Sequence, residues 1–169
     1  MRVSEEQLAA VAKEVLETMA FAFEMPGEDA PVTGDLLRAT VDFRGPFCGA
    51  LSLTLPRAVM PDLVVNMLGV GEEEIPPEQD QRDAIGELAN VICGNIVQVL
   101  AGPQPVFELA PPKIDLPKPT PASTPTGENV THARISLEAG LAEVTLLLQP
   151  DNAQTHGTAH MAAPAPNAR

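Results

Sequence analysis

The segment spanning residues 83–100 constrains the fold of this chain more than any other stretch. At about 100° per residue, its apolar residues fall on one broad face of a helix. A helical face of this width has to be buried against other elements. The segment therefore predicts a long helix packed on the core of a domain. The apolar positions are Ile85, Leu88, Ala89, Ile92, Ile96, Val99 and Leu100.

The opposite side of the same helix carries Asp83, Glu87, Asn90 and Gly94, which we call the polar stripe. Their spacing of four, three and four residues keeps them within about 60° of arc. One interpretation is an ordinary solvated helix face. The second is a working site, because glycine costs a helix about 1 kcal/mol relative to alanine and asparagine is also a mediocre helix former. A glycine in line with the polar pair would let another surface approach closely.

The polar stripe, followed by Asn95, resembles the active-site helix of the CheC/CheX/FliY family. These phosphatases act on the phosphorylated chemotaxis response regulator CheY. Downstream, residues 106–114 (VFELAPPKI) resemble the strand and proline turn that follow this helix in CheX-like domains. As a pattern of elements, the resemblance covers about residues 4–149.

Composition limits the classes of partner. A chain of 169 residues is long enough for one domain with a real core. That core must be aliphatic, because there is no Trp or Tyr and only five Phe, and stacking on nucleic-acid bases is disfavoured for the same reason. A formal net charge of −13 opposes binding to nucleic acid or to an anionic membrane. We expect a protein partner.

The cysteine and histidine residues predict neither a disulfide framework nor a metal site. Two cysteines, Cys48 and Cys93, are too few for a disulfide framework. His156 and His160 have a chelating spacing, but the glycine between them and the lack of flanking carboxylates argue against a metal site. No apolar run typical of a signal peptide or a membrane span is found, so we expect a cytoplasmic location.

The N-terminal residues predict a second long helix, from about residue 4 to 23, with a capping box formed by Ser4 and Gln7. Its polar positions repeat the spacing of the polar stripe. A simple amphipathic helix explains them; the resemblance adds a second interpretation, a degenerate copy of the active helix, because family members can carry two helices related by pseudo-symmetry. The positions are Lys13, Glu17, Ala20 and Glu24, and Ala20 leaves that copy without an amide.

The remaining segments read as strands, a short helix and connections. A proline near its start and Gly69 at its end delimit a packing helix over 56–68. Residues 110–127 are dense in proline and predict a polyproline-like connection instead of a strand. Alternating apolar residues predict strands over 36–43, 47–55, 105–109, 129–137 and 141–148.

Together these elements predict an α+β fold, an α/β sandwich. A mostly antiparallel sheet is covered on one face by two long pseudo-symmetric helices and a shorter packing helix, as in CheC/CheX-like domains. The predicted domain spans residues 1–150 and includes a proline-rich loop at 111–127. Residues 151–169 show no periodicity and predict a flexible tail.

The resemblance implies a phosphatase mechanism in which a neutral amide orients the attacking water. Asn90 would take that role, while Glu87 would pair with the lysine beside the phosphoryl group of a CheY-like receiver domain. Asp83 and Gly94 would contact the receiver. The receiver would supply both the phosphorylated aspartate and Mg²⁺, so the chain would need no cofactor or metal of its own.

Two other functions stay open. The same helix could bind a receiver without catalysing a reaction, as part of a binding module or a flagellar-switch-like scaffold. A CheX-like domain could also serve a pathway other than chemotaxis. Asn90 favours the enzyme, because an amide is the group that orients water. The resemblance also leaves open a homodimer paired through its sheets, as in single-site relatives.

Overall fold

The computed structural model describes residues 2–25, 34–69, 76–117, 127, 129–138 and 140–149. The helices are α1 (Glu5–Ala20), a 3-10 turn η1 (Arg57–Val59), α2 (Met60–Leu68) and α3 (Glu78–Ala101). The strands are β1 (Leu36–Arg44), β2 (Gly49–Pro56), β3 (Glu108–Leu109), β4 (Lys113–Asp115), β5 (Val130–Leu137) and β6 (Gly140–Leu148).

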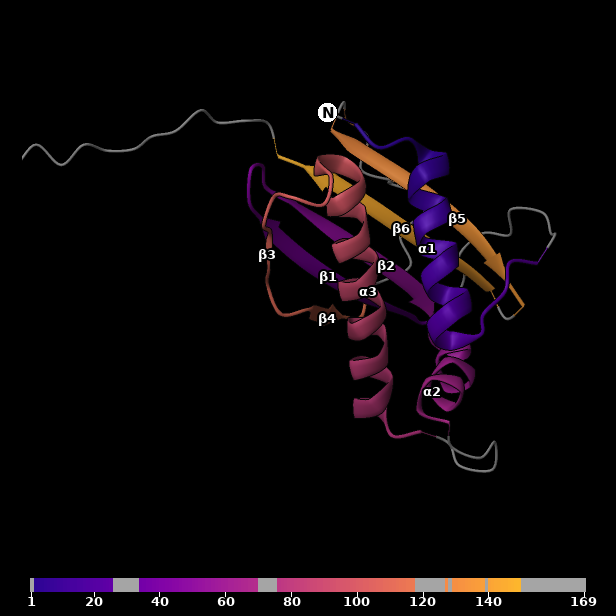
Figure 1. Cartoon of the computed structure of the whole chain (residues 1–169). Coiled ribbons are helices and arrows are strands. Elements are labelled where there is room, and N and C mark those ends of the chain that lie inside the picture. Colours follow the sequence, from indigo (N-terminus) through magenta and orange to yellow (C-terminus); the bar gives the residue numbers. More distant parts are fainter. Residues whose placement is uncertain are drawn as a thin grey trace, which may run out of the picture.

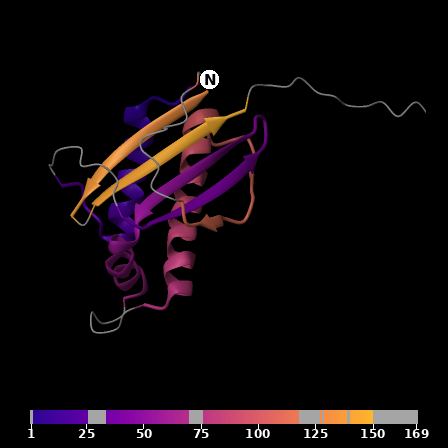
Figure 2. The same cartoon turned by 180° about the vertical axis from the view of Figure 1, so that it is seen from behind.

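The strands form one antiparallel sheet in the order β3-β1-β2-β6-β5, and β4 also pairs with β1. The two long helices, α1 and α3, lie side by side over one face of this sheet, and the short α2 packs against both near one end (Figure 1). Seen from behind, the strands lie in front of the helices (Figure 2). The predicted α+β architecture is therefore confirmed.

Alternation along the strands places the core between sheet and helices. In β1, Leu37, Ala39, Val41 and Phe43 are buried beneath the helix layer. The other face of the sheet is mostly polar and carries side-chain pairs such as Arg134–Glu143 at 3.1 Å. The core is aliphatic as predicted, since Phe43 is the only phenylalanine among its largest fully buried side chains.

α3 is the central core helix. Its predicted apolar face is buried, with the exception of Val99, which is 47% exposed near the C-terminal end. By length and composition alone α3 could cross a membrane, but 56% of its most apolar window is buried inside the domain. Core helices can have the same length and apolar composition as membrane spans, so this composition reflects packing within the domain.

Three of the predicted elements differ from the structure. The Ser4–Gln7 capping box forms, but α1 ends at Ala20 and not near residue 23, because Phe21 adopts a left-handed backbone with φ of 50°. The strand predicted at 105–109 shrinks to Glu108–Leu109. Most importantly, residues 113–115 form β4 inside the predicted polyproline connection, because they pair with Arg38–Thr40 on the free edge of β1. The remainder of the proline-rich loop at 118–126, the tail and its two histidines lie outside the described residues.

Candidate functional site

The polar stripe lies on the side of α3 that faces away from the sheet. Asp83 and Glu87 are exposed, whereas Asn90 and Gly94 are partly exposed. The residues that alternate with them, such as Ile85, point into the core. The structure thus brings all four predicted site residues together on one surface, and a regular helix anchored by its buried face fixes their spacing.

The four residues differ in how they are held. The Nε2 of Gln79 donates a hydrogen bond to Oδ1 of Asp83 at 2.8 Å, so the first carboxylate is engaged within α3 itself. Among the described residues, neither Glu87 nor Asn90 has a side-chain hydrogen bond or an ion pair. A carboxylate and an amide one turn apart are therefore both available to a partner.

Gly94 leaves open space at the C-terminal end of the stripe. A Cβ built at this position would meet no heavy atom within 4 Å. Packing inside the domain therefore does not require a glycine here, although glycine destabilises a helix interior. The absence of a side chain instead exposes backbone beside Asn90, as expected for a surface that another molecule approaches.

A second glycine, Gly86, was not singled out by its sequence, although it borders the stripe. It is buried, and a Cβ at this position would lie 3.4 Å from Cβ of Pro112 and 3.6 Å from Cδ1 of Ile114. α3 therefore packs closely against the segment leading into β4. The sequence feature that could have indicated this contact is the Pro-Pro-Lys-Ile-Asp pattern, in which the apolar Ile114 lies between two charged residues.

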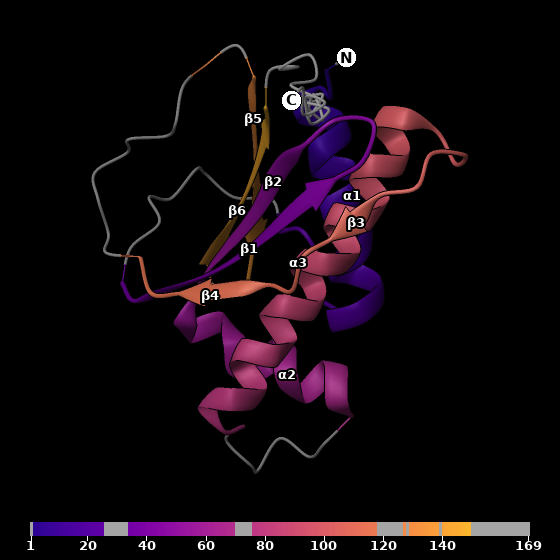
Figure 3. The same ribbon diagram turned by 90° about the vertical axis from the view of Figure 1, so that its left-hand side faces the viewer.

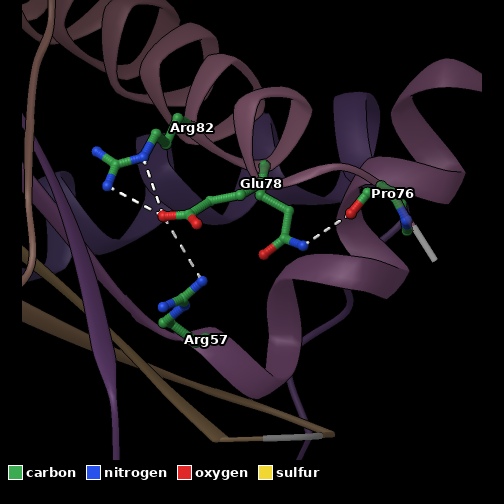
Figure 4. Close-up of polar contacts among 5 residues, drawn as sticks. Arg57, Pro76, Glu78 and Arg82 are labelled. Atoms are coloured by element: carbon green, nitrogen blue, oxygen red, sulfur yellow. Dashed lines mark hydrogen bonds and ion pairs between the residues drawn. The ribbon is translucent and has the colours of Figure 1, made fainter.

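The N-terminal end of α3 is tied to the rest of the domain by a charged cluster that the sequence did not predict (Figure 4). Oε1 of Glu78 accepts hydrogen bonds from Nε and Nη2 of Arg82 at 3.3 and 3.1 Å, and it lies 3.8 Å from Nη2 of Arg57 in η1. The amide of Gln81 donates to the carbonyl of Pro76 at 3.0 Å. Because these groups are partly exposed, the cluster fixes the start of the helix more than it adds stability.

α1 offers no equivalent of the stripe. Ala20 is 0% exposed, and its carbonyl accepts a hydrogen bond from Nδ2 of Asn66 at 3.0 Å. Glu24 lies beyond the helix and pairs with Lys13 at 2.7 Å. The structure favours the simple amphipathic interpretation of α1, because Ala20 is buried without a polar side chain and Glu17 is only partly exposed.

The family model described as "Chemotaxis phosphatase CheX" matches residues 37–136. The chain belongs to this CheX family. The matched range contains all of α3 with its polar stripe, β2 to β4, and all of β1 except its first residue, Leu36. α1 lies outside it. No curated protein sequence matches the chain significantly.

Solved structures with the CheX fold are similar over most of the chain. A CheX from Desulfovibrio desulfuricans is 25% identical, with a TM-score of 0.64 over 84% of this chain and 96% of its own. A CheX from Vibrio vulnificus is 23% identical, with a TM-score of 0.65 over 84% and 93% of the two chains. A complex of CheX with CheY, BeF3 and Mg²⁺ from Borrelia burgdorferi is 16% identical, with a TM-score of 0.62 over 88% and 100%.

Proposed function

We propose that this CheX-family protein speeds hydrolysis of the aspartyl phosphate of a CheY-type response regulator. The observation that carries the proposal is the pair of Glu87 and Asn90, which lie on the outward side of α3 and have no side-chain partner among the described residues. Membership of a chemotaxis phosphatase family supports the reaction. The complex between the related B. burgdorferi CheX and CheY supports the partner.

Asn90 is the proposed catalytic residue. Loss of an aspartyl phosphate requires a water molecule in line with the scissile bond, and positioning contributes more than basicity in this kind of reaction. An amide suits the task, because its oxygen accepts a hydrogen bond from the water while its NH2 group can donate to a phosphoryl oxygen. A carboxylate at the same place would be repelled by the phosphoryl charge.

Glu87 is the proposed docking residue. It lies one helical turn before Asn90 and is exposed. A carboxylate there can pair with the lysine that receiver domains keep beside the phosphoryl group, in a charge-assisted hydrogen bond. Such a pair would set the distance between Asn90 and the phosphorus atom. Mg²⁺ would be held by the receiver, so this chain would contribute neither metal ligands nor a nucleophile.

A non-catalytic function remains the second candidate. A surface that binds a receiver need not hydrolyse its phosphate, and the polar stripe would serve a scaffold equally well. The availability of Asn90 favours catalysis, since an amide without a side-chain partner among the described residues adds little to binding that Glu87 already provides. The proposed function also implies a cytoplasmic location, because receiver domains act in the cytoplasm.

The decay of radiolabelled phosphate on each CheY-type receiver of the same organism tests the proposal. Wild-type protein should shorten the phosphoryl lifetime of at least one receiver, and Asn90→Ala should abolish that effect. Gln98→Ala is the matched control, because it removes an exposed amide from the same helix. Binding without any shortening would favour the scaffold. Full activity of Asn90→Ala would refute the mechanism.

A further inference from the structure

The polar stripe is too narrow to be a whole interface. A specific protein interface buries about 800 Å² on each partner and involves about 20–30 residues a side. Four residues along one helix supply a small part of that area. A receiver that reaches Asn90 therefore has to rest on a flank of α3 as well: on α1, or on the segment of residues 106–115, which contains β3 and β4 and runs beside α3 (Figure 3).

The α1 flank is poorly suited to this role. Along the middle of α1 the outward residues are polar and acidic, and they include exposed Glu14 and partly exposed Glu17. Charged residues are depleted from interface cores.

The β3–β4 segment faces the helix layer with apolar residues. Leu109 pairs with Phe43 and Ile114 pairs with Ala39 in antiparallel register. Directly opposed residues of an antiparallel pair lie on the same face of the sheet. Phe43 and Ala39 are buried under the helices, so Leu109 and Ile114 are on the α3 side too.

The close approach of Pro112 to Gly86 fixes the position of this segment along the axis of α3. Leu109 pairs with Phe43 and Lys113 pairs with Thr40, so four steps of this segment lie beside three of β1. Along the strand direction, Pro112 and Leu109 are therefore about 7 Å apart. The same distance corresponds to about five residues of α3, at about 1.5 Å each. Leu109 therefore lies level with the turn that runs from Asn90 to Gly94.

Leu109 is 36% exposed, and Pro111 is also exposed. The buried core of an interface is more apolar than the rest of a protein surface and is depleted of charged residues, so exposed apolar side chains suit its centre. We propose that Leu109 and Pro111 form an apolar shoulder beside Asn90 and that the receiver domain packs on it while its phosphoryl group reaches the polar stripe. This inference rests on the proposed function and identifies the surface that completes it.

Binding of each CheY-type receiver, activated with beryllium fluoride and Mg²⁺, can be measured by calorimetry for wild type and Leu109→Ser. The substitution should weaken binding about tenfold, equivalent to about 1.4 kcal/mol, and should raise KM while kcat stays within about twofold. Leu147→Ser is the matched control, because Leu147 is 44% exposed on the opposite face of the sheet, and it should bind as wild type does. Leu109→Met should restore the affinity.

The outcomes separate the two proposals. If wild type binds a receiver and Asn90→Ala loses activity, but Leu109→Ser binds as tightly as wild type, the shoulder alone is refuted. If wild type binds no receiver, both the proposed function and the proposed docking on the shoulder are refuted. Circular dichroism and urea unfolding confirm that each variant is folded. Should Leu109→Ser fail to fold, Pro111→Ser takes its place with the same expected loss of affinity.

Discussion

Glu87 and Asn90 lie one helical turn apart on the outward side of α3, and neither side chain bonds to another described residue. The buried face of the same helix holds the domain together through residues such as Ile85 and Ile92, which are 0% exposed. Stability and the proposed chemistry are therefore carried by opposite sides of one element. Substitutions on the outward side should change activity without unfolding the protein.

Asn90→Ala should reduce the phosphatase rate by about 100-fold or more, because a misplaced water loses the benefit of orientation. The free energy of unfolding should change by less than about 0.5 kcal/mol, since the amide has no partner among the described residues. Single-turnover decay of the labelled receiver and urea unfolding measure the two quantities. A large loss of stability would mean that the amide is structural.

Glu87→Gln keeps the shape of the side chain but removes its charge. If Glu87 pairs with a receiver lysine, the variant should bind more weakly and raise KM more than it lowers kcat. The affinity of wild type should also fall as salt is added, and that of the variant should fall less. Titrations at low and high ionic strength make the comparison. Equal salt dependence would argue against a charge pair at this residue.

The polar stripe could be predicted from the sequence because helical periodicity is local. Positions 83, 87, 90 and 94 share a face of any regular helix, whatever surrounds it. The β1–β2 hairpin was predicted for the same reason, since its alternating apolar residues and short connection are contiguous in the chain. Local patterns of this kind determine which residues are outside.

Contacts between distant segments were not predictable in the same way. β4 exists because residues 113–115 find the free edge of β1, more than seventy positions earlier, and proline-rich composition conceals that pairing. The approach of Pro112 to Gly86 depends on where β4 docks. The left-handed backbone of Phe21, which ends α1 early, is likewise set by its surroundings and not by its residue type.

Gly94→Ala should stabilise the protein by up to about 1 kcal/mol, because the added Cβ meets no atom and alanine favours the helix. It should also weaken receiver binding if the open backbone is used for docking. Gly86→Ala is the matched control on the same helix, and its gain should be smaller, because its Cβ would press on Pro112 at 3.4 Å. Unchanged affinity of Gly94→Ala would remove this glycine from the interface.

Glu17→Ala should leave phosphatase activity within about twofold, a barrier change of about 0.4 kcal/mol. The neighbouring position that would have to orient water is Ala20, which is buried and has no polar side chain. The rate is measured with the same labelled receiver as for Asn90→Ala. A tenfold loss would show that α1 takes part in the reaction after all.

Cys93 provides a test of burial within α3. Burial, aided by the negative charge of Asp42, raises the pKa of its thiol from 9.0 to about 12. The folded protein therefore holds this proton more tightly than the unfolded chain does. The stability contributed by Cys93 is fully present below about pH 9 and is lost as the pH rises toward 12.

Between pH 9 and 11, the unfolding free energy of wild type should accordingly fall more steeply than that of Cys93→Ala, by up to about 1.4 kcal/mol per pH unit. Urea unfolding at several pH values gives both slopes, and comparing slopes removes the constant cost of the smaller side chain. Cys48 is only partly buried and remains in both proteins, so it cancels. Parallel curves would show that the Cys93 thiol ionises as readily in the folded domain as in the unfolded chain.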